Sequence, residues 1–398
     1  MTGNYWAFTL TDGALRMLVV LHFHALGYSP LQIALLFLFY EFFGVVTNLL
    51  GGWLGVRIGL HRTMNIGLGL QVFALGMLLV PAIMLTVPWV MAAQALSGIA
   101  KDLNKMSAKS SIKVLVPEDK QSKLFRWVAI LTGSKNALKG AGFFLGGALL
   151  SVFGFQVAVL VMAIALGLVW LASLILLKKD LGKSKSKSKS KPKFTEIFSK
   201  SQAINSLSAA RLFLFGARDV WFVVALPVYL SANFGWDHWS VGGFLASWII
   251  GYGIIQTLAP RITGTTTDRV PDGKSAFRWA CGLSVVPAVI AVAMGTGFET
   301  EIILIAGLLI FGAVFAVNSS LHSYLIVSYA DRDGASLDVG FYYMANALGR
   351  LIGTVLSGWV FQEYGFTACL FISSAFVGLA AAISLSLPHQ RSLQTRVS

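Results

Sequence analysis

The chain has 398 residues, of which 56% are hydrophobic and 12% charged, and its formal net charge is +14. The charged share is about half that of a typical soluble domain, which excludes a soluble multidomain enzyme. Long apolar runs separate the Lys and Arg residues, and this excludes a nucleic-acid binder with one basic face. The isolated Cys281 and Cys369 predict neither a disulfide framework nor a metal clip. The composition therefore predicts a polytopic membrane protein.

Apolar runs near the spanning length of about 20 residues recur along the whole chain. They predict an all-α membrane protein with twelve transmembrane helices. We expect the first to be a membrane helix and not a cleaved signal peptide, because no basic segment precedes it and charged residues lie inside it. In the first half the helices are predicted at about 5–26, 31–54, 63–85, 88–112, 127–151 and 156–177. In the second half they are predicted at about 203–230, 240–260, 277–296, 302–329, 337–361 and 366–387.

Residues 178–200 interrupt this pattern with nine Lys residues, many of them in an alternating Lys-Ser tract. Such a segment cannot bury apolar surface, which predicts a disordered linker. The sequence thus predicts a six-helix bundle over 1–177, a linker over 178–200 and a second six-helix bundle over 201–398. Lys and Arg occur only in alternate predicted loops, and the positive-inside rule then places the linker and both termini in the cytoplasm.

The two predicted halves resemble each other. A shift of 211 residues aligns the helix at about 127–151 with the helix at about 337–361. The aligned pairs are Gly142 with Gly353, Gly147 with Gly358, Gly154-Phe155 with Gly365-Phe366, and Lys139 with Arg350. Paired halves with a site near the bilayer midplane are typical of transporters.

Ionisable side chains inside membrane helices are costly and indicate function. The predicted helices contain nine cations and four acids. These are Arg16, Lys101, Lys105, Lys109, Lys135, Lys139, Arg211, Arg218 and Arg350, with Asp12, Glu41, Asp102 and Asp219. Because the acids cannot neutralise the cations, we expect a cavity for a multiply charged anion, such as a phosphorylated or carboxylated metabolite. A purely structural network of ion pairs is the alternative.

Some of these charges have simple structural interpretations. Asp12 and Arg16 are four residues apart on one helix and can neutralise each other. Arg218 and Asp219 are adjacent, about 100° apart around a helix, which argues against a pair between them.

Other cations lie near predicted helix ends. Lys105, Lys109 and Arg211 can extend to the lipid headgroups from there. Lys135 and Lys139 share one face near the middle of a helix that carries no acid, so that they repel each other.

We predict that cations and amides bind the anion. The predicted binding residues are Arg16, Lys101, Lys105, Lys135, Lys139, Arg218, Arg350, Asn136 and Asn346. Asp12, Glu41 and Asp219 are expected to pair with cations or to carry protons. His22, His24 and His322 are further candidates for a proton relay. No metal site, cofactor motif or catalytic nucleophile is predicted.

Several motifs resemble those of the major facilitator superfamily. Gly52, Arg57 and Gly59 match its loop signature Gly-x-x-x-Asp-Arg-x-Gly-Arg-Arg, although Val56 replaces the acid. Blocks at 9–24, 37–44, 98–107, 132–140 and 215–222 are similar to organoarsenical efflux permeases of bacterial arsenic-resistance operons.

This resemblance implies export of 1-arseno-3-phosphoglycerate across the bacterial inner membrane. It also implies a functional partner, the glyceraldehyde-3-phosphate dehydrogenase that makes this compound from arsenate. Two alternatives stay open: an organophosphate or phosphate exchanger of the same fold without an arsenic role, and a membrane receptor or scaffold that transports nothing.

Overall fold

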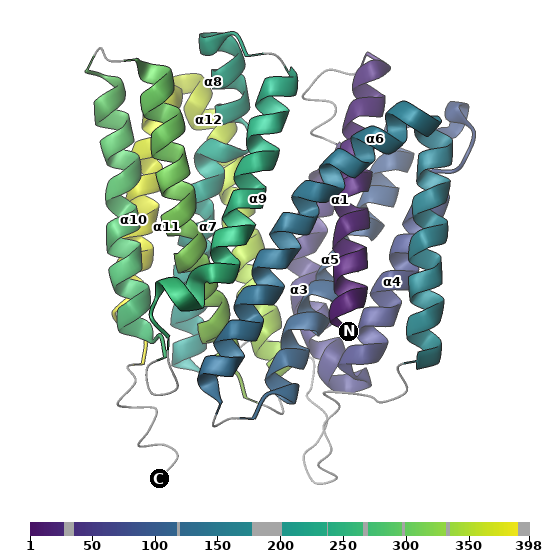
Figure 1. Cartoon of the computed structure of the whole chain (residues 1–398), viewed down its shortest axis with the longest axis horizontal. Helices are drawn as coiled ribbons and strands as arrows, with labels where there is room; N and C mark the ends of the chain where they lie inside the picture. The colour runs from purple at the N-terminus through teal and green to yellow at the C-terminus, as the bar shows by residue number, and fades with distance from the viewer. Residues whose placement is uncertain are drawn as a thin grey trace. The chain divides into compact units, whose positions relative to one another are not determined.

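The computed structural model describes residues 1–27, 36–117, 120–176, 201–236, 238–265, 270–296, 299–331 and 335–388. Throughout these ranges the regular structure is helical (Figure 1). The chain forms two compact units. Unit 1 is Met1–Leu115, Ser134–Ser199 and Ala330–Met344, and unit 2 is Val116–Gly133, Lys200–Tyr329 and Ala345–Ser398. The predicted linker at 178–200 lies outside the described residues, so the division proposed from sequence stays a prediction.

Unit 1 is organised around one central helix. Its helices are α1 (Thr2–Ala25), α3 (Leu38–Ile58), α4 (Leu60–Met77), α5 (Val87–Leu115) and most of α6 (Gln121–Leu176). α5 packs against α1, α3 and α4, and it is buried along most of its length. The side chains that α5 carries are therefore held inside the unit.

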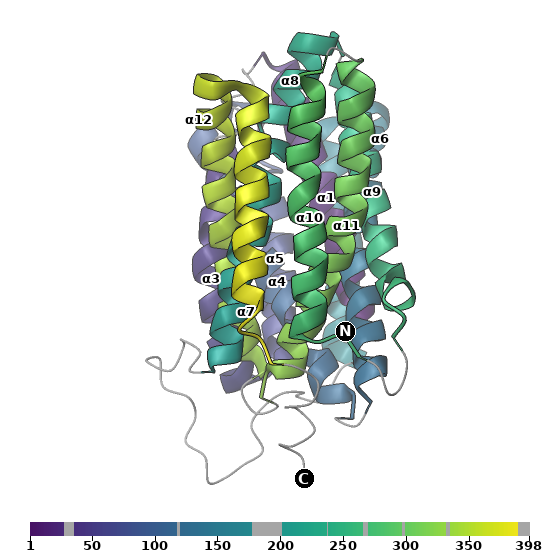
Figure 2. The same cartoon turned by 90° about the vertical axis from the view of Figure 1, so that its left-hand side faces the viewer.

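Unit 2 has an aromatic core. Its helices are α7 (Gln202–Phe222), α8 (Ala225–Phe234), α9 (His238–Ile262), α10 (Gly273–Met294), α11 (Thr300–Tyr329) and most of α12 (Ala335–Ser384). Trp221 packs edge-on against Trp248 and Phe311 in this core. Figure 2 shows α10 beside α11 and the C-terminal part of α12 at one surface. Ser374 of α12 donates a hydrogen bond to the carbonyl oxygen of Ser284 in α10 at 2.5 Å.

The described segments accommodate all twelve predicted helices. In the described ranges, six helical segments are long and apolar enough to cross a membrane. They are Gln121–Leu176, Gln202–Phe234, Ser240–Ile262, Gly273–Met294, Thr300–Tyr329 and Ala335–Ser384. The first and last are 56 and 50 residues long, and each bends at one glycine, so that each covers two spanning lengths. α1, α3, α4 and α5 supply the other four, with polar side chains that lower their hydropathy.

One predicted helix is too long. The pattern places it at about 63–85, whereas α4 ends at Met77 and a short 3-10 helix follows at Ala82–Met84. Pro81 precedes that turn with extended backbone (φ −53°, ψ 148°). Proline disfavours the helical conformation in the residue before it and cannot donate to the preceding turn, so the apolar run continues while the helix does not.

The internal repeat recurs in the backbone. Gly154 and Gly365, which the shift of the sequence aligns, break α6 and α12 with almost the same dihedral angles (φ 72°, ψ 175° and φ 79°, ψ −179°). A side chain strongly disfavours such positive φ values, so glycine is needed at both bends. The phenylalanine after each bend stacks on a ring of its own unit. The ring centroids of Phe155 and His22 are 4.0 Å apart, and those of Phe366 and Tyr229 are 4.7 Å apart.

The contact between α1 and α6 depends on one of two neighbouring glycines. A Cβ on Gly146 would lie 3.0 Å from the Cα of Ala14, whereas a Cβ on Gly147 would meet only a leucine methyl at 3.8 Å. We expect Gly146→Ala to lower the free energy of unfolding by about 1–3 kcal/mol because the backbones must separate. Gly147→Ala is the matched control and should be neutral or stabilising by up to about 1 kcal/mol, since alanine favours helix. Thermal unfolding of the two purified variants measures this, and equal midpoints would contradict the assigned contact.

Candidate functional site

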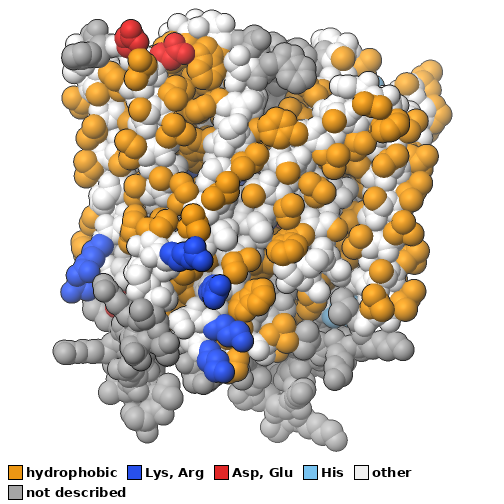
Figure 3. Space-filling view, in the orientation of Figure 1, with side chains coloured by type: hydrophobic (Ala, Val, Ile, Leu, Met, Phe, Trp, Pro, Cys, Tyr) orange, Lys and Arg blue, Asp and Glu red, His pale blue; other side chains and the backbone are white. Residues whose placement is uncertain are grey.

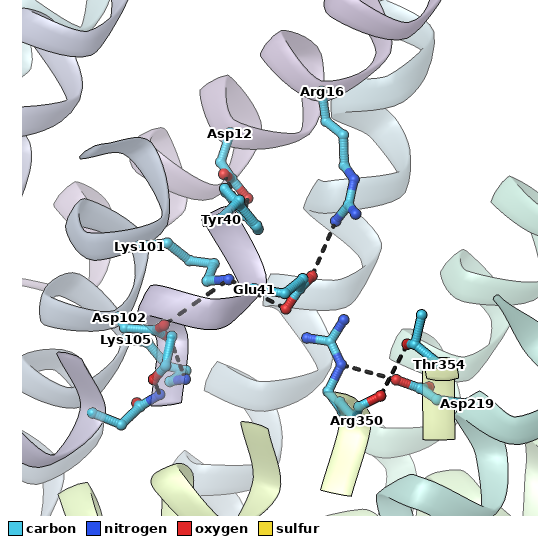
Figure 4. Close-up of polar contacts among 12 residues, drawn as sticks. Asp12, Arg16, Tyr40, Glu41, Lys101, Asp102, Lys105, Asp219, Arg350 and Thr354 are labelled. Carbon is cyan, nitrogen blue, oxygen red and sulfur yellow. Dashed lines mark hydrogen bonds and ion pairs between the residues drawn. The ribbon is translucent and has the colours of Figure 1, made fainter. Parts of the chain in front are cut away.

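Charged residues of unit 1 form a chain of ion pairs between α1, α3 and α5 (Figure 4). Glu41 of α3 forms ion pairs with Arg16 of α1 at 3.6 Å and with Lys101 of α5 at 3.9 Å. Lys101 also lies 4.0 Å from Asp102, which forms a second, shorter ion pair with Lys105. We call these five residues the Glu41 cluster. The cluster brings together four of the predicted site residues, and Asp102 joins them.

Tyr40 organises the same region, although the sequence did not mark it as a site residue. Its hydroxyl donates to both carboxylate oxygens of Asp12, at 2.7 and 3.0 Å. The ammonium of Lys101 lies 3.7 Å from the centre of its ring, and the guanidinium of Arg16 lies 5.4 Å from it. Arg16 therefore pairs with Glu41, and the pair predicted with Asp12 is wrong. A partner on another helix displaces the local one because Tyr40 satisfies the carboxylate.

Removal of the Tyr40 hydroxyl has a built-in control. Tyr5 and Tyr40 are both 2% exposed, but the hydroxyl of Tyr5 has no hydrogen-bond partner in the structure. Tyr40→Phe should lower the free energy of unfolding by about 1.5–3 kcal/mol, because a buried carboxylate loses a charge-assisted hydrogen bond. Tyr5→Phe should be neutral or stabilising. Chemical unfolding followed by tryptophan fluorescence compares the two, and an equal loss in both would contradict the role of Tyr40.

Two lysines of α5, for which the sequence also allowed extension to the headgroups, are buried in the structure. Lys105 is 9% exposed and Lys109 is 2% exposed. Their ammonium groups lie 4.5 and 5.1 Å from the centre of the Tyr343 ring, within unit 1. Of the two possibilities that the sequence left open, extension to the headgroups is the one that the structure contradicts, because α5 is the central helix and directs both lysines inward.

The remaining predicted residues of unit 1 lie on α6. Lys135, Asn136 and Lys139 are half-buried there. The carbonyl oxygen of Lys139 faces α1 closely, only 2.6 Å from the position that a Cβ on Gly13 would take. These residues lie on a segment packed against α1, and their role in binding stays a prediction.

The second charged group lies in unit 2 and is centred on Asp219. This carboxylate is fully buried, and it accepts from Arg218 at 2.5 Å and from Arg350 at 3.0 Å. We call these three residues the Asp219 cluster (Figure 4). The expectation that Arg218 and Asp219 do not pair is wrong. An angle of about 100° separates their Cβ directions, but the arginine arm is long enough to curl back to the neighbouring carboxylate.

Arg211 of α7 is buried as well, against the expectation of an interfacial position. It is 3% exposed. It donates to the side-chain oxygen of Asn346 at 2.9 Å and to the carbonyl and hydroxyl oxygens of Ser319, both at 3.1 Å. Asn346, a predicted binding residue, thus holds a cation in this structure.

The histidine candidates for a proton relay belong to different units. His22 stacks on Phe155 in unit 1, and His322 is fully buried in α11 of unit 2. The side chain of His24 lies outside the described residues. Within the described ranges, no group of three His, Cys, Asp or Glu side chains is placed to hold a metal ion.

Long spanning helices, a repeated glycine bend and cation clusters inside both units are the features of a polytopic membrane protein with two related halves. The sequence profile of the Major Facilitator Superfamily matches residues 1–336. The chain therefore belongs to this superfamily, whose members are transporters and not enzymes.

Known proteins of this kind resemble the chain over different lengths. It is 28% identical over 160 residues to an uncharacterized MFS-type transporter, YwfA of Bacillus subtilis, a match that covers 40% of this chain and 36% of that protein. The structure is similar to that of the human organic anion transporter MFSD10, with a TM-score of 0.72, 14% identity, and coverage of 96% of this chain and 97% of that one. For the E. coli fucose:proton symporter the TM-score is 0.74 and the identity 13%, with coverage of 96% and 97%. The predicted major facilitator fold is confirmed.

Proposed function

We propose that this chain is a secondary active exporter of an organic arsenate-phosphate anion, 1-arseno-3-phosphoglycerate. The observation that carries the proposal is the excess of cations inside both units. Unit 1 holds six intramembrane cations with three acids, and unit 2 holds three with one. Charge buried in a low dielectric needs a counterion, and an anionic substrate supplies it. The name of MFSD10, an organic anion transporter, agrees with this class of substrate.

The arsenic-containing substrate rests on the sequence blocks that resemble organoarsenical efflux permeases. Such a substrate bears a phosphate and an arsenate, both of which suit arginine and lysine donors. Its arsenic is pentavalent and does not require thiols, which fits a chain with two isolated cysteines. Glyceraldehyde-3-phosphate dehydrogenase is the proposed source of the substrate.

We further propose that the protein lies in the bacterial inner membrane with both termini in the cytoplasm. In unit 2, exposed Lys and Arg gather at one end of the helices and exposed acids at the other, with apolar side chains between them (Figure 3). The cations are Lys120, Lys123, Arg126, Arg261, Lys274 and Arg278, and the acids are Glu299, Glu301 and Glu363. The positive-inside rule assigns the cationic end to the cytoplasm.

The proposal is tested by arsenate tolerance in a sensitive bacterium that expresses the chain with and without the dehydrogenase. We expect higher tolerance and lower cellular arsenic only when both are present. Resistance independent of the dehydrogenase would show that the specific substrate is wrong. Unchanged cellular arsenic, together with phosphate exchange by the purified protein in vesicles, would favour the organophosphate or phosphate exchanger.

A further inference from the structure

A stripe of polar side chains lies between two packed helices of unit 2. α7 and α11 pack against each other, and Arg211 of α7 donates hydrogen bonds to Ser319 of α11; we call the polar residues around this contact the α7–α11 seam. Its members are Ser208 and Arg211 of α7 with Asn318, Ser319, His322 and Ser323 of α11. The two residues of α7 are 2% and 3% exposed, and the four of α11 are fully buried. Asn318 and His322 are one turn apart and so share a face of α11.

Much of the polar capacity of the seam is unused in the structure. Both polar atoms of the Asn318 amide, both ring nitrogens of His322 and the hydroxyls of Ser208 and Ser323 have no hydrogen-bond partner. Buried polar groups are nearly always paired, by protein, water or ligand. Six unpaired atoms in one seam therefore leave hydrogen-bonding capacity that a water molecule or a ligand can use.

The donors and the positive charge of the seam indicate which class of ligand can bind there. An amide, an imidazole and two hydroxyls offer donors, and the guanidinium of Arg211 adds a full positive charge. Arg211 lies close enough to His322 to act on it electrostatically. A cation would be repelled there, whereas an oxyanion would accept hydrogen bonds from these donors and gain from the charge.

We propose that the α7–α11 seam is an oxyanion-binding site, distinct from the Asp219 cluster. The inference rests on the proposed transport of an anion. The two sites are linked along α7: the Phe215 ring lies 3.8 Å from the guanidinium of Arg211 and 4.9 Å from that of Arg218. Seven residues separate these arginines, about 10 Å along the helix axis. The seam is thus a second binding site for the anion, and it lies closer to the N-terminus of α7 than the Asp219 cluster does.

The test is calorimetric titration of the purified full-length protein in detergent with inorganic phosphate. Asn318→Leu and His322→Phe each remove unpaired seam donors and should weaken phosphate binding about tenfold. Ser323→Ala removes one hydroxyl with little change in volume and serves where a larger substitution prevents folding, with about threefold weaker binding expected. Gln71→Met is the matched control, because Gln71 of α4 is also a fully buried, unpaired amide. Its affinity should equal that of the unsubstituted protein.

The same titration in an Arg350→Gln background separates the two sites. Phosphate binding that persists there and still depends on Asn318 supports the seam. Binding that depends only on Arg350, with Asn318→Leu unchanged, overturns the seam and leaves the proposed function intact. An absence of phosphate binding in a protein that still transports organic anions also overturns the seam alone. An absence of both binding and anion transport overturns the proposed function with it.

Discussion

Asp219→Asn is expected to lower the free energy of unfolding by about 3–5 kcal/mol, the largest loss of stability that we predict for a single substitution. The carboxylate is fully buried. It lies 2.5 Å from a guanidinium nitrogen of Arg218 and 3.0 Å from one of Arg350. Asparagine keeps the shape but removes the charge, so that Arg218 and Arg350 face each other without it. Thermal unfolding in detergent, with chemical denaturation as a second measure, gives the loss.

Two further variants show whether charge is the cause. Arg350→Gln combined with Asp219→Asn should recover part of the stability, because one of the two cations is gone. Glu363→Gln removes an exposed acid of α12 and should change the stability by less than about 0.5 kcal/mol. A loss below about 1 kcal/mol for Asp219→Asn, or a double variant less stable than the single one, would contradict the assigned pairing.

Arg350→Gln is expected to lower kcat/KM for anion transport about 100-fold or more. Arg350 is half-buried, and loss of one charge-assisted contact between such an arginine and an oxyanion costs about 2–5 kcal/mol, which corresponds to this range. Arg350→Lys keeps the charge but loses the planar pair of donors. Its kcat/KM should lie between that of Arg350→Gln and that of the unsubstituted protein. Uptake of labelled phosphorylated substrate into inside-out membrane vesicles measures the effect.

The control for this prediction is Lys274→Gln, which removes an exposed cation at the start of α10. It should leave transport unchanged. Equal transport by Arg350→Gln and the unsubstituted protein would exclude Arg350 from binding. A drop in transport that follows only a drop in the amount of folded protein would instead favour a structural ion-pair network.

The glycine bends are a part of the fold that the local sequence determines. The match of Gly154-Phe155 with Gly365-Phe366 was visible in the sequence, and both glycines bend their helices with the same positive φ. A backbone conformation of this kind is set by a single residue type, so sequence predicts it well. The α4 boundary was missed because hydropathy continues past Pro81 while the helix ends at Met77.

For the charged residues, the sequence did not determine the contacts. Their presence inside the helices was clear from sequence, but their partners were not. Arg16 pairs with Glu41 and not with Asp12, and the missing clue was the Tyr40 hydroxyl on another helix. Helical spacing gives the face on which a residue lies, but it does not tell what the facing helix offers or how far a long side chain reaches.

By itself the sequence determined the class of protein, the number of helices, the relation between the halves and the excess of cations over acids within the helices. These follow from residue hydropathy, glycine conformation and formal charge, which are local properties. Only the tertiary structure decided which cations are buried, as for Lys109 and Arg211, and which carboxylate each one contacts. Burial and pairing depend on helices that are distant in the chain, and no periodicity within one helix contains that information.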